Sequence, residues 1–595
     1  MWYNQYVAIT KYGDAAMRVT KNVTKKGPSF YIIRSVSGGS TEIVEKLGTE
    51  KEIKDKYHCE DAYEWAKNRA SELTIQEKES QTKVMVPLRP FVPITSGEQM
   101  SFNIGYLFLQ QLYYDLKIPS VCREISKRHA FEYDLNEIFS RLVYGRILFP
   151  SSKLSTFKQS ADLFEPPSFE YHQLARALSV LAEESDLIQE KLYRFSSEII
   201  PRKTGVLYYD CTNFYFEIEE EKGIRKFGHS KEKRPSPIVQ MGLFMDYSGL
   251  PLAMCITDGN ANEQSTLLPL ERKILRDFGA SRFVVCTDAG LSSEESRKFN
   301  NFGERSFVTT QSIRKLKKGR KEWWLDPDGW HISGSTDVFN INEICADEKL
   351  RTKHYETIFY KEAFIEGYDD QRDIEFNQTL LVTFSLKYKD YLKRIRDGHI
   401  ERARSLIQQG AARIDRKNQQ DPRRFITRTS KTPAGETASK TSFELSVDLI
   451  SEESRYDGFY AVCTNLDDDI IDILHVIKSR WEIEESFRIM KSEFAARPVY
   501  LQRDDRIRAH FVTCFTSLLI YRLLEKKLGG TFTCSQIIST LRGMRITKAG
   551  DKGYLPSYTR TELTDALHDA AGFRTDYEIL RKKYMQGVVR RSKNL

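Results

Sequence analysis

The hydrophobic pattern of the chain changes its period near residue 204, and this change predicts a central sheet. From about 100 to 200, apolar residues recur at helical spacing. From 204 to 310, short runs rich in β-branched and aromatic residues alternate with amphipathic stretches. The predicted order is three strands, a helix, a strand, a helix and a fifth strand, in the segments "GVLYYD", "IVQMGLFMD", "LPLAMCI", "EQSTLLPLERKILRDFG", "RFVVCTD", "SSEESRKFN" and "SFVTT".

This order is typical of an RNase H-like core, a mixed five-stranded sheet with helices on its faces. The expected fold class is therefore α/β in the core and α+β overall. After Thr310 the core pattern stops for about 150 residues, which is too long for a structureless loop inside a domain. The segment predicts an inserted subdomain, and the core resumes with "GFYAVCTN" and the helical pattern "DDDIIDILHVIKSRWEIEESFRIMKSEF".

The same patterns divide the whole chain into six regions. A hairpin with a Gly-Gly-Ser turn and an amphipathic helix predict a small α+β domain at the N-terminus, and a Pro-rich linker follows it. The predicted regions are 1–92 (small α+β domain), 93–200 (helical region), 201–310 (first part of the core), 311–458 (inserted subdomain), 459–530 (second part of the core) and 531–595 (basic helical tail).

Composition excludes several classes of protein. The nine cysteines are scattered, with none at C-x-x-C spacing, which argues against a zinc ribbon or a disulfide framework and favours a reducing compartment. The N-terminus has no apolar signal segment, and "HFVTCFTSLLIYRLLEKK" is predicted to be too short and too polar to span a bilayer. No Gly-Lys or His-Glu dipeptide is present, so a P-loop and an H-E-x-x-H zinc site are excluded. We expect a cytoplasmic protein with no membrane partner and no nucleotide cofactor.

The positions of the charged residues along the chain say more about binding partners than the net charge does. The net charge of +8 permits a nucleic-acid partner without requiring one. Basic residues gather in three stretches: six with no acid in 311–321, eight against three acids in 413–440, and six with no acid in the last fifteen residues. Each stretch alone fits a solvated loop or a frayed tail, but the three together favour phosphate contacts.

Two aspartates follow predicted core strands. Asp210 ends the first strand and Asp288 ends the fourth, and these strands are neighbours in RNase H-like order. Two carboxylates this close repel unless a cation lies between them, and carboxylate oxygens select Mg²⁺ or Mn²⁺ over zinc. The alternative is an aspartate that caps a helix or begins a turn, which "DAGLSSEE" permits for Asp288.

A third carboxylate comes from the stretch "SRWEIEESFRIMKSEF", which the pattern predicts as part of one long helix. Trp481 and Phe487 belong to the apolar stripe, and Glu484 lies between them, at the edge of the face that packs on the core. Arg480 lies four residues before Glu484, and Lys491 lies seven after it. The pattern fits a metal-binding glutamate flanked by phosphate-binding cations, or an ordinary surface ion pair between Arg480 and Glu484.

At this spacing of Arg480, Glu484 and Lys491, the chain resembles the DDE-type insertion-sequence transposases whose third motif is Y-x2-R-x3-E-x6-K. Similar segments surround Asp210 ("YYDCTNFYFE") and Asp288 ("TDAGLSS"). Further similar segments are "FGHSKEKRPSPIVQMGLFMDYSGLPL", "GNANEQSTL", "RPVYLQRDDRIRAHFVTCF" and "YGRILFPSSKLST". The resemblance covers roughly residues 1–530 and rests on several short motifs in the right order.

The resemblance implies a transposase of a bacterial or archaeal insertion sequence that performs Mg-dependent DNA strand cleavage and strand transfer. Asp210, Asp288 and Glu484 would hold two Mg²⁺ ions, for which Mn²⁺ can substitute, during an in-line displacement at phosphorus. Arg480 and Lys491 would grip phosphates beside the scissile bond. The implied partners are double-stranded DNA, as terminal inverted repeats and as target, and a second copy of the chain bound to that DNA, so the protein would associate with the nucleoid.

Several further residues and regions follow as expectations. The basic loop after the first core strand offers His229, Lys231 and Arg234 as DNA contacts, and the region 93–200 is the expected sequence-specific DNA binder. His510, predicted to open a helix, is left outside the triad. The tryptophans of the insert either stack on a flipped base or form the insert's own core: Trp323, Trp324 and Trp330.

One position departs from the family motif. The family's tyrosine falls on Ile477, which leaves the triad intact and puts one contact near the DNA in doubt. Two alternatives therefore stay open, a catalytically silent DNA-binding protein derived from a transposase and a host nuclease of RNase H-like fold. The complete triad weighs against the first, and the order of the other motifs weighs against the second.

Overall fold

The computed structural model describes most of the chain and divides it into two compact units. Described are residues 17–24, 27–36, 40–57, 59–80, 83–86, 90–232, 234–279, 282–291, 293–316, 318–409, 421–431 and 437–594. One unit comprises Met1–Glu98 with Ala549–Gly553, and the other comprises Gln99–Lys548 with Tyr554–Leu595. Much of the predicted basic stretch 413–440 lies outside the described residues.

The first unit is a three-stranded antiparallel sheet with two helices. It contains β1 (Arg18–Thr24), β2 (Gly27–Ser35), β3 (Thr41–Thr49), α1 (Glu50–Tyr57) and α2 (Ala62–Ser80). Phe30 and Ile32 alternate along β2 toward the buried face, where Ile53 and Ala66 of the helices pack. The predicted hairpin and helix are present. The sequence pattern missed β1 because "RVTKNVT" offers only two apolar positions.

The second unit is built on a mixed sheet with the strand order β10-β13-β16-β9-β8-β5-β6-β7. The meander β5–β6–β7 is antiparallel, while β8 pairs in parallel with β5 and β9 pairs in parallel with β8. These five strands have the RNase H-like order that the sequence predicts. Their bounds, with the two helices between them, are β5 (Val206–Tyr215), β6 (Ile238–Asp246), β7 (Pro251–Asp258), α9 (Gln264–Asp277), β8 (Phe283–Thr287), α10 (Glu294–Phe299) and β9 (Arg305–Thr310).

The sheet has eight strands where the sequence predicts five, because two strands of the insert and one strand of the second part of the core extend it. β16 (Phe459–Thr464) pairs antiparallel with β9, β13 (Gln378–Phe384) with β16, and β10 (Phe359–Ile365) with β13. Trp324 and Trp330 are fully buried in the core on this part of the sheet, and Trp323 packs against the same cluster. The tryptophans therefore form the insert's own core. The expectation that they stack on a base is wrong for the two buried rings.

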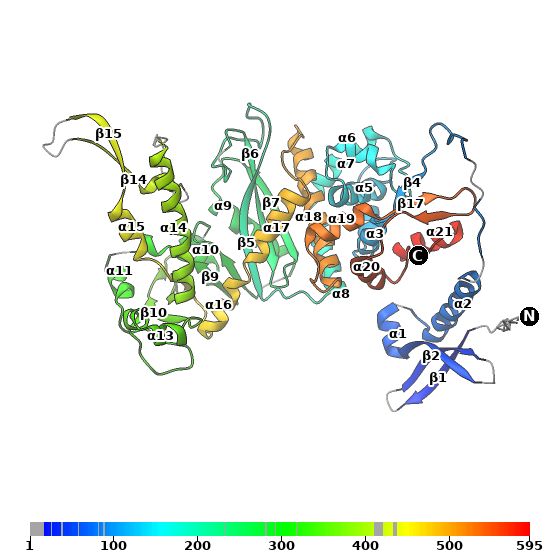
Figure 1. The fold of residues 1–595 in the computed structure, drawn as a ribbon, viewed down its shortest axis with the longest axis horizontal. Coiled ribbons are helices and arrows are strands. Elements are labelled where there is room, and N and C mark those ends of the chain that lie inside the picture. The colour runs from blue at the N-terminus through cyan, green and yellow to red at the C-terminus, as the bar shows by residue number, and fades with distance from the viewer. Residues whose placement is uncertain are drawn as a thin grey trace, which may run out of the picture. The chain divides into compact units, whose positions relative to one another are not determined.

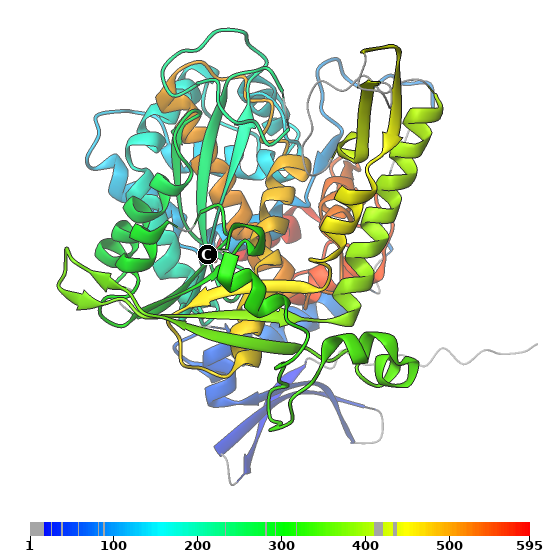
Figure 2. The same cartoon turned by 90° about the vertical axis from the view of Figure 1, so that its left-hand side faces the viewer.

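The remainder of the insert is mainly helical. Helix α14 (Leu386–Gln408) lies beside the hairpin of β14 (Ile426–Lys431) and β15 (Thr437–Leu445) in both views (Figures 1 and 2). The smaller elements are a 3-10 turn (Ile313–Lys315), α11 (Lys318–Leu325), α12 (Ile341–Ala346), α13 (Glu348–Lys353), β11 (Tyr368–Asp369), β12 (Ile374–Glu375), a second 3-10 turn (Pro422–Phe425) and α15 (Val447–Ser454).

Helix α18 (Asp504–Lys527) is the centre of the helical part of the second unit. Among the described residues it is the one helix long and apolar enough to cross a membrane, and 94% of that window is buried inside the protein. The prediction that this stretch is too short and too polar for a span is therefore wrong. Its apolar composition is that of a core helix surrounded by other helices.

Helices α3, α5, α7 and α8 pack on α18, the C-terminal helices α20 and α21 pack on α3, and all of them share one core. Leu107 and Leu142 from the region 93–200 join the same buried cluster as Leu567 and Met585 from the region 531–595. Neither region has a separate core, and the last helix is packed rather than frayed. The elements are β4 (Ser101–Asn103), α3 (Tyr106–Asp115), α4 (Ile118–Ser126), α5 (Leu135–Leu148), α6 (Lys153–Ser160), α7 (Tyr171–Glu183), α8 (Ser185–Ile199), α19 (Cys534–Gly543), β17 (Arg545–Lys548), β18 (Tyr554–Pro556), α20 (Glu562–Ala571) and α21 (Lys582–Ser592).

Candidate active site

Two aspartates lie level with each other on neighbouring parallel strands. Tyr208 of β5 is the partner of Cys286 of β8; two residues further along the chain come Asp210, still in β5, and Asp288, the first residue after β8. Asp210 does not end its strand as predicted, because β5 continues to Tyr215 in pairing with β6. That pairing holds the backbone of Asp210 past the point where β8 ends, so both carboxylates lie at one edge of the parallel pair.

The two carboxylates have different electrostatic surroundings. Burial raises the pKa of Asp210, and the nearby charge of Asp288 raises it further, against the opposing charges of Lys231 and Arg480. Burial alone would also raise the pKa of Asp288, but hydrogen bonding and the charge of Arg480 hold it below its ordinary value. The hydroxyl of Thr310 and the backbone N–H of Ala289 each donate to Asp288 Oδ1 at 2.7 Å.

The helix that carries the third carboxylate is broken where the sequence predicts continuity. α16 (Ile470–Lys478) ends before α17 (Trp481–Arg488), which passes into a π-helical turn (Ile489–Glu493). Ile483 and Phe487 point into the core, whereas Trp481 is 58% exposed. The buried face of α17 therefore contains Ile483, and Trp481, two residues earlier, lies on the exposed face. Glu484 shares the exposed face, with a side chain 63% accessible.

Arg480 connects the glutamate to the second aspartate. Its guanidinium lies 3.4 Å from Asp288 Oδ1 and 3.5 Å from Glu484 Oε1, with the side chain only 13% exposed. Burial opposes the charged form, but the carboxylates of Asp288, Asp210 and Glu484 raise the pKa of Arg480. The i,i+4 pair that the sequence suggests is present, and it extends across to the sheet.

Two lysines flank the other side of Asp210. Burial, and to a smaller extent the charge of Lys231, lower the pKa of Lys491 to about 8, against the opposing charge of Asp210. Lys491 Nζ lies 3.9 Å from Glu232 Oε1. Lys231 donates to the carbonyl of Cys211, the residue that follows Asp210. Both predicted phosphate-binding lysines therefore lie close to the first aspartate.

The other two predicted DNA contacts belong to the same loop as Lys231. The Arg234 guanidinium lies 4.1 Å above the ring of Tyr215, at the end of β5, and its side chain is 49% exposed. His229 is exposed, and its backbone carbonyl accepts a hydrogen bond of 3.2 Å from Asn213 of β5. The loop is thus attached to the strand that carries Asp210.

The donor set fits a hard divalent cation by charge and by ligand type. Asp210, Asp288 and Glu484 offer only carboxylate oxygens, which Mg²⁺ and Mn²⁺ prefer. The negative charge of Asp288 raises the pKa of Asp210, and a cation between the two carboxylates would offset this repulsion. Their oxygens do not all lie within 4.8 Å of one another, because Arg480 lies between Asp288 and Glu484.

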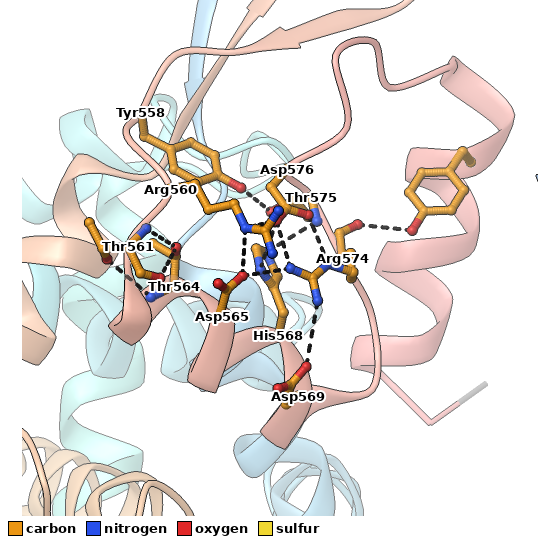
Figure 3. Close-up of polar contacts among 11 residues, drawn as sticks. Tyr558, Arg560, Thr561, Thr564, Asp565, His568, Asp569, Arg574, Thr575 and Asp576 are labelled. Atoms are coloured by element: carbon orange, nitrogen blue, oxygen red, sulfur yellow. Dashed lines mark hydrogen bonds and ion pairs between the residues drawn. The ribbon is translucent and has the colours of Figure 1, made fainter. Parts of the chain in front are cut away.

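Among the described residues, a closer group of candidate ligands lies elsewhere, at Asp565, His568 and Asp576 (Figure 3). Arg560 and Arg574 already pair with both of its carboxylates. His568 Nε2 accepts from the backbone N–H of Thr575 at 3.1 Å, so the neutral ring carries its proton on Nδ1, the atom facing Asp576. Two guanidiniums and a protonated nitrogen exclude a cation, so the cluster is an ion-pair network that holds the C-terminal helices.

Sequence reasoning missed Thr310 and misplaced His510. Thr310 ends β9 beside Asp288, and a polar residue at the end of the neighbouring strand was the available signal. His510 lies inside α18 rather than at its start, is 5% exposed, and bonds the carbonyl of Ala496 at 3.1 Å. It is a buried structural histidine, which agrees with leaving it outside the triad. Ile477 borders a cavity of about 650 Å³ that Tyr388 and Tyr460 also line.

Comparison with known proteins adds little to this geometry. No family model matches the sequence, and no curated protein matches it. Among solved structures, the chain is similar to the piggyBac transposase in a cryo-EM structure of its synaptic complex with hairpin DNA, with a TM-score of 0.33 and 8% sequence identity. That similarity covers 83% of this chain and 88% of the other.

Proposed function

We propose that the protein is the transposase of a bacterial or archaeal insertion sequence and that it cuts and joins DNA strands with Mg²⁺. The observation that carries the proposal is the level placement of Asp210 and Asp288 on parallel strands, with Arg480 joining Asp288 to Glu484. In this proposal the three carboxylates of the DDE-like motif would bind divalent cations at the end of the parallel pair of strands. The resemblance of the surrounding segments to DDE-type transposases supports the same reading.

Each side chain of the site has a role in this proposal. Asp210, Asp288 and Glu484 hold the divalent cations, which when bound activate a water or a 3′-hydroxyl and stabilise the leaving oxygen. Arg480 and Lys491 grip phosphates on either side of the scissile bond, because one lies near Asp288 and the other near Asp210. Lys231 and Arg234 extend the positive surface along the loop after β5, with His229 beside them.

The partners follow from the reaction. A transposase acts on the inverted repeats at the two ends of its element and on a target duplex, and pairing two ends requires two copies of the chain on DNA. The exposed faces of Glu484 and Asp288 leave room for a duplex to approach the carboxylates. We place the reaction in the cytoplasm, at the nucleoid.

DNA cleavage tests the proposal directly. The purified protein is incubated with end-labelled duplexes covering the DNA on both sides of its own gene, in the presence of Mg²⁺. We expect breaks at the element ends with the wild type and at least a ~10³-fold loss with Asp210→Asn or Glu484→Gln. Glu485→Gln is the matched control, because Glu485 is the next residue along α17 and pairs with Arg488. Equal cleavage by all four proteins, or none by the wild type, contradicts the proposal.

A further inference from the structure

Arg480 occupies an unusual position for a DNA-binding arginine. Its side chain is 13% exposed, while the side chains of the two carboxylates that it contacts are 51% exposed at Asp288 and 63% exposed at Glu484. These carboxylates come from different parts of the chain, the residue directly after β8 and the first turn of α17. The guanidinium is therefore an internal counter-ion between two groups that the proposed function assigns to metal binding.

The contacts that hold Arg480 in place are long and incomplete. Charge-assisted N–H···O bonds typically span about 2.7–2.9 Å, whereas those of Arg480 span 3.4 and 3.5 Å. Its Nε is buried and has no hydrogen-bond partner in the described part of the chain. A buried N–H without a partner costs free energy. A phosphate, which offers several oxygens to the planar fork of an arginine, would satisfy these donors better than the present arrangement.

The position of Arg480 also acts on any cation that approaches the site. A divalent ion between Asp288 and Glu484 would lie beside a positive charge in a partly desolvated environment, where repulsion is stronger than in water. The free protein therefore weakens its own metal site. When a phosphate takes the guanidinium, both carboxylates lose their internal partner and become available to the ion.

We infer that Arg480 couples the two ligands of the site, so that DNA phosphate and the divalent cation each bind more tightly in the presence of the other. The inference rests on the proposed function, because it takes Asp288 and Glu484 as metal ligands. Coupling of this kind is reciprocal: whatever factor phosphate contributes to metal affinity, the metal contributes to phosphate affinity. A nuclease built in this way holds its metal firmly only when DNA lies in the site.

Metal affinity without DNA gives a test that does not depend on catalysis. Mn²⁺ binding to the full chain is measured by the loss of the free-ion electron paramagnetic resonance signal, for the wild type, Arg480→Gln and Arg488→Gln. Arg488 is the matched control, since it lies on α17 and pairs with Glu485 away from Asp288. We expect Arg480→Gln to bind Mn²⁺ roughly 5-fold or more tightly than the wild type, and Arg488→Gln to match the wild type.

Two further variants make the result decisive. Arg480→Lys keeps the charge and should stay close to the wild type, and Arg480→Met replaces the glutamine variant if that one does not fold. Adding a short duplex should raise the Mn²⁺ affinity of the wild type by a larger factor than that of Arg480→Gln. Unchanged or weaker Mn²⁺ binding by the folded Gln and Met variants overturns the inference. The proposed function fails separately, if the wild type does not cut DNA.

Discussion

Glu271 is a fully buried glutamate of α9, remote from the proposed reaction, and its environment favours the neutral acid. One of its oxygens accepts a hydrogen bond of 2.8 Å from Asn300 Nδ2, while its other oxygen and Asn300 Oδ1 have no partner among the described residues. Burial raises the pKa of Glu271 from 4.5 to about 8, against the hydrogen bond from Asn300 and the charge of Arg305. A protonated Glu271 offers the O–H donor that Asn300 Oδ1 lacks.

The sign of the pH dependence follows from the two states. The unfolded chain ionises this glutamate above pH 4.5, whereas the folded protein keeps it protonated up to about pH 8. The folded state therefore binds the proton more tightly, and its stabilising effect is complete at low pH and lost as the pH rises through this window. The slope is about 1.4 kcal/mol per pH unit, which gives an upper limit of roughly 5 kcal/mol at pH 9.

Glu271→Gln removes the titration and keeps the shape. Its amide oxygen can accept from Asn300 Nδ2 as the acid does, and its N–H groups supply a donor where the protonated acid supplies its O–H. We expect the variant to match the wild type at pH 5 and to be more stable by about 2–5 kcal/mol at pH 9 in urea unfolding. Glu295→Gln is the control, because Glu295 is exposed on α10. Parallel pH profiles for Glu271→Gln and the wild type would refute the reasoning.

Three other predictions follow from buried or exposed groups. DNA affinity, measured by fluorescence anisotropy, should fall between pH 7 and 9 in the wild type but not in Lys491→Arg, because burial lowers the pKa of Lys491 to about 8 and the ammonium is lost above it; equal slopes contradict this. Asp246→Ala should cost about 3–5 kcal/mol in urea unfolding, because Arg202 then stays buried without its carboxylate; a loss below about 1 kcal/mol contradicts this. Trp324→Ala should lower the free energy of unfolding by about 3–5 kcal/mol and Trp481→Ala by under about 1 kcal/mol, because Trp324 is fully buried and Trp481 is 58% exposed. Similar losses for the two variants would contradict the assigned burial.

The core topology was predictable because its signals are local. Alternation and turn residues mark each strand, and the order of strands and helices between 204 and 310 restricts the sheet to a few arrangements. The extension of the sheet by β16, β13 and β10 was not predictable. An edge strand can pair with any strand-forming segment that reaches it, and the pattern of "TLLVTFS" does not indicate which edge of the sheet this segment joins.

For the candidate site, the sequence predicts residue types and spacing but not the side-chain geometry. Residue types and spacing predicted Asp210, Asp288 and Glu484 as the site carboxylates, and helical phase predicted Glu484 at the edge of the core-facing side, whereas the structure shows its side chain 63% exposed. Phase failed for Trp481, because a helical pattern read across the break before α17 accumulates an error in angle. The placement of Arg480 between two carboxylates depends on side-chain geometry across the sheet, which no sequence spacing encodes.

The central claim is that Asp210, Asp288 and Glu484 share a divalent cation, and iron-mediated cleavage of the protein itself tests it most directly. Fe²⁺ replaces Mg²⁺ in the presence of duplex DNA, ascorbate and peroxide then generate hydroxyl radicals at the bound ion, and mass spectrometry locates the broken peptide bonds. We expect breaks near all three carboxylates, suppressed by excess Mg²⁺ and absent in Asp210→Asn. Breaks confined to the Asp565, His568 and Asp576 cluster, or unaffected by Mg²⁺, would contradict the account.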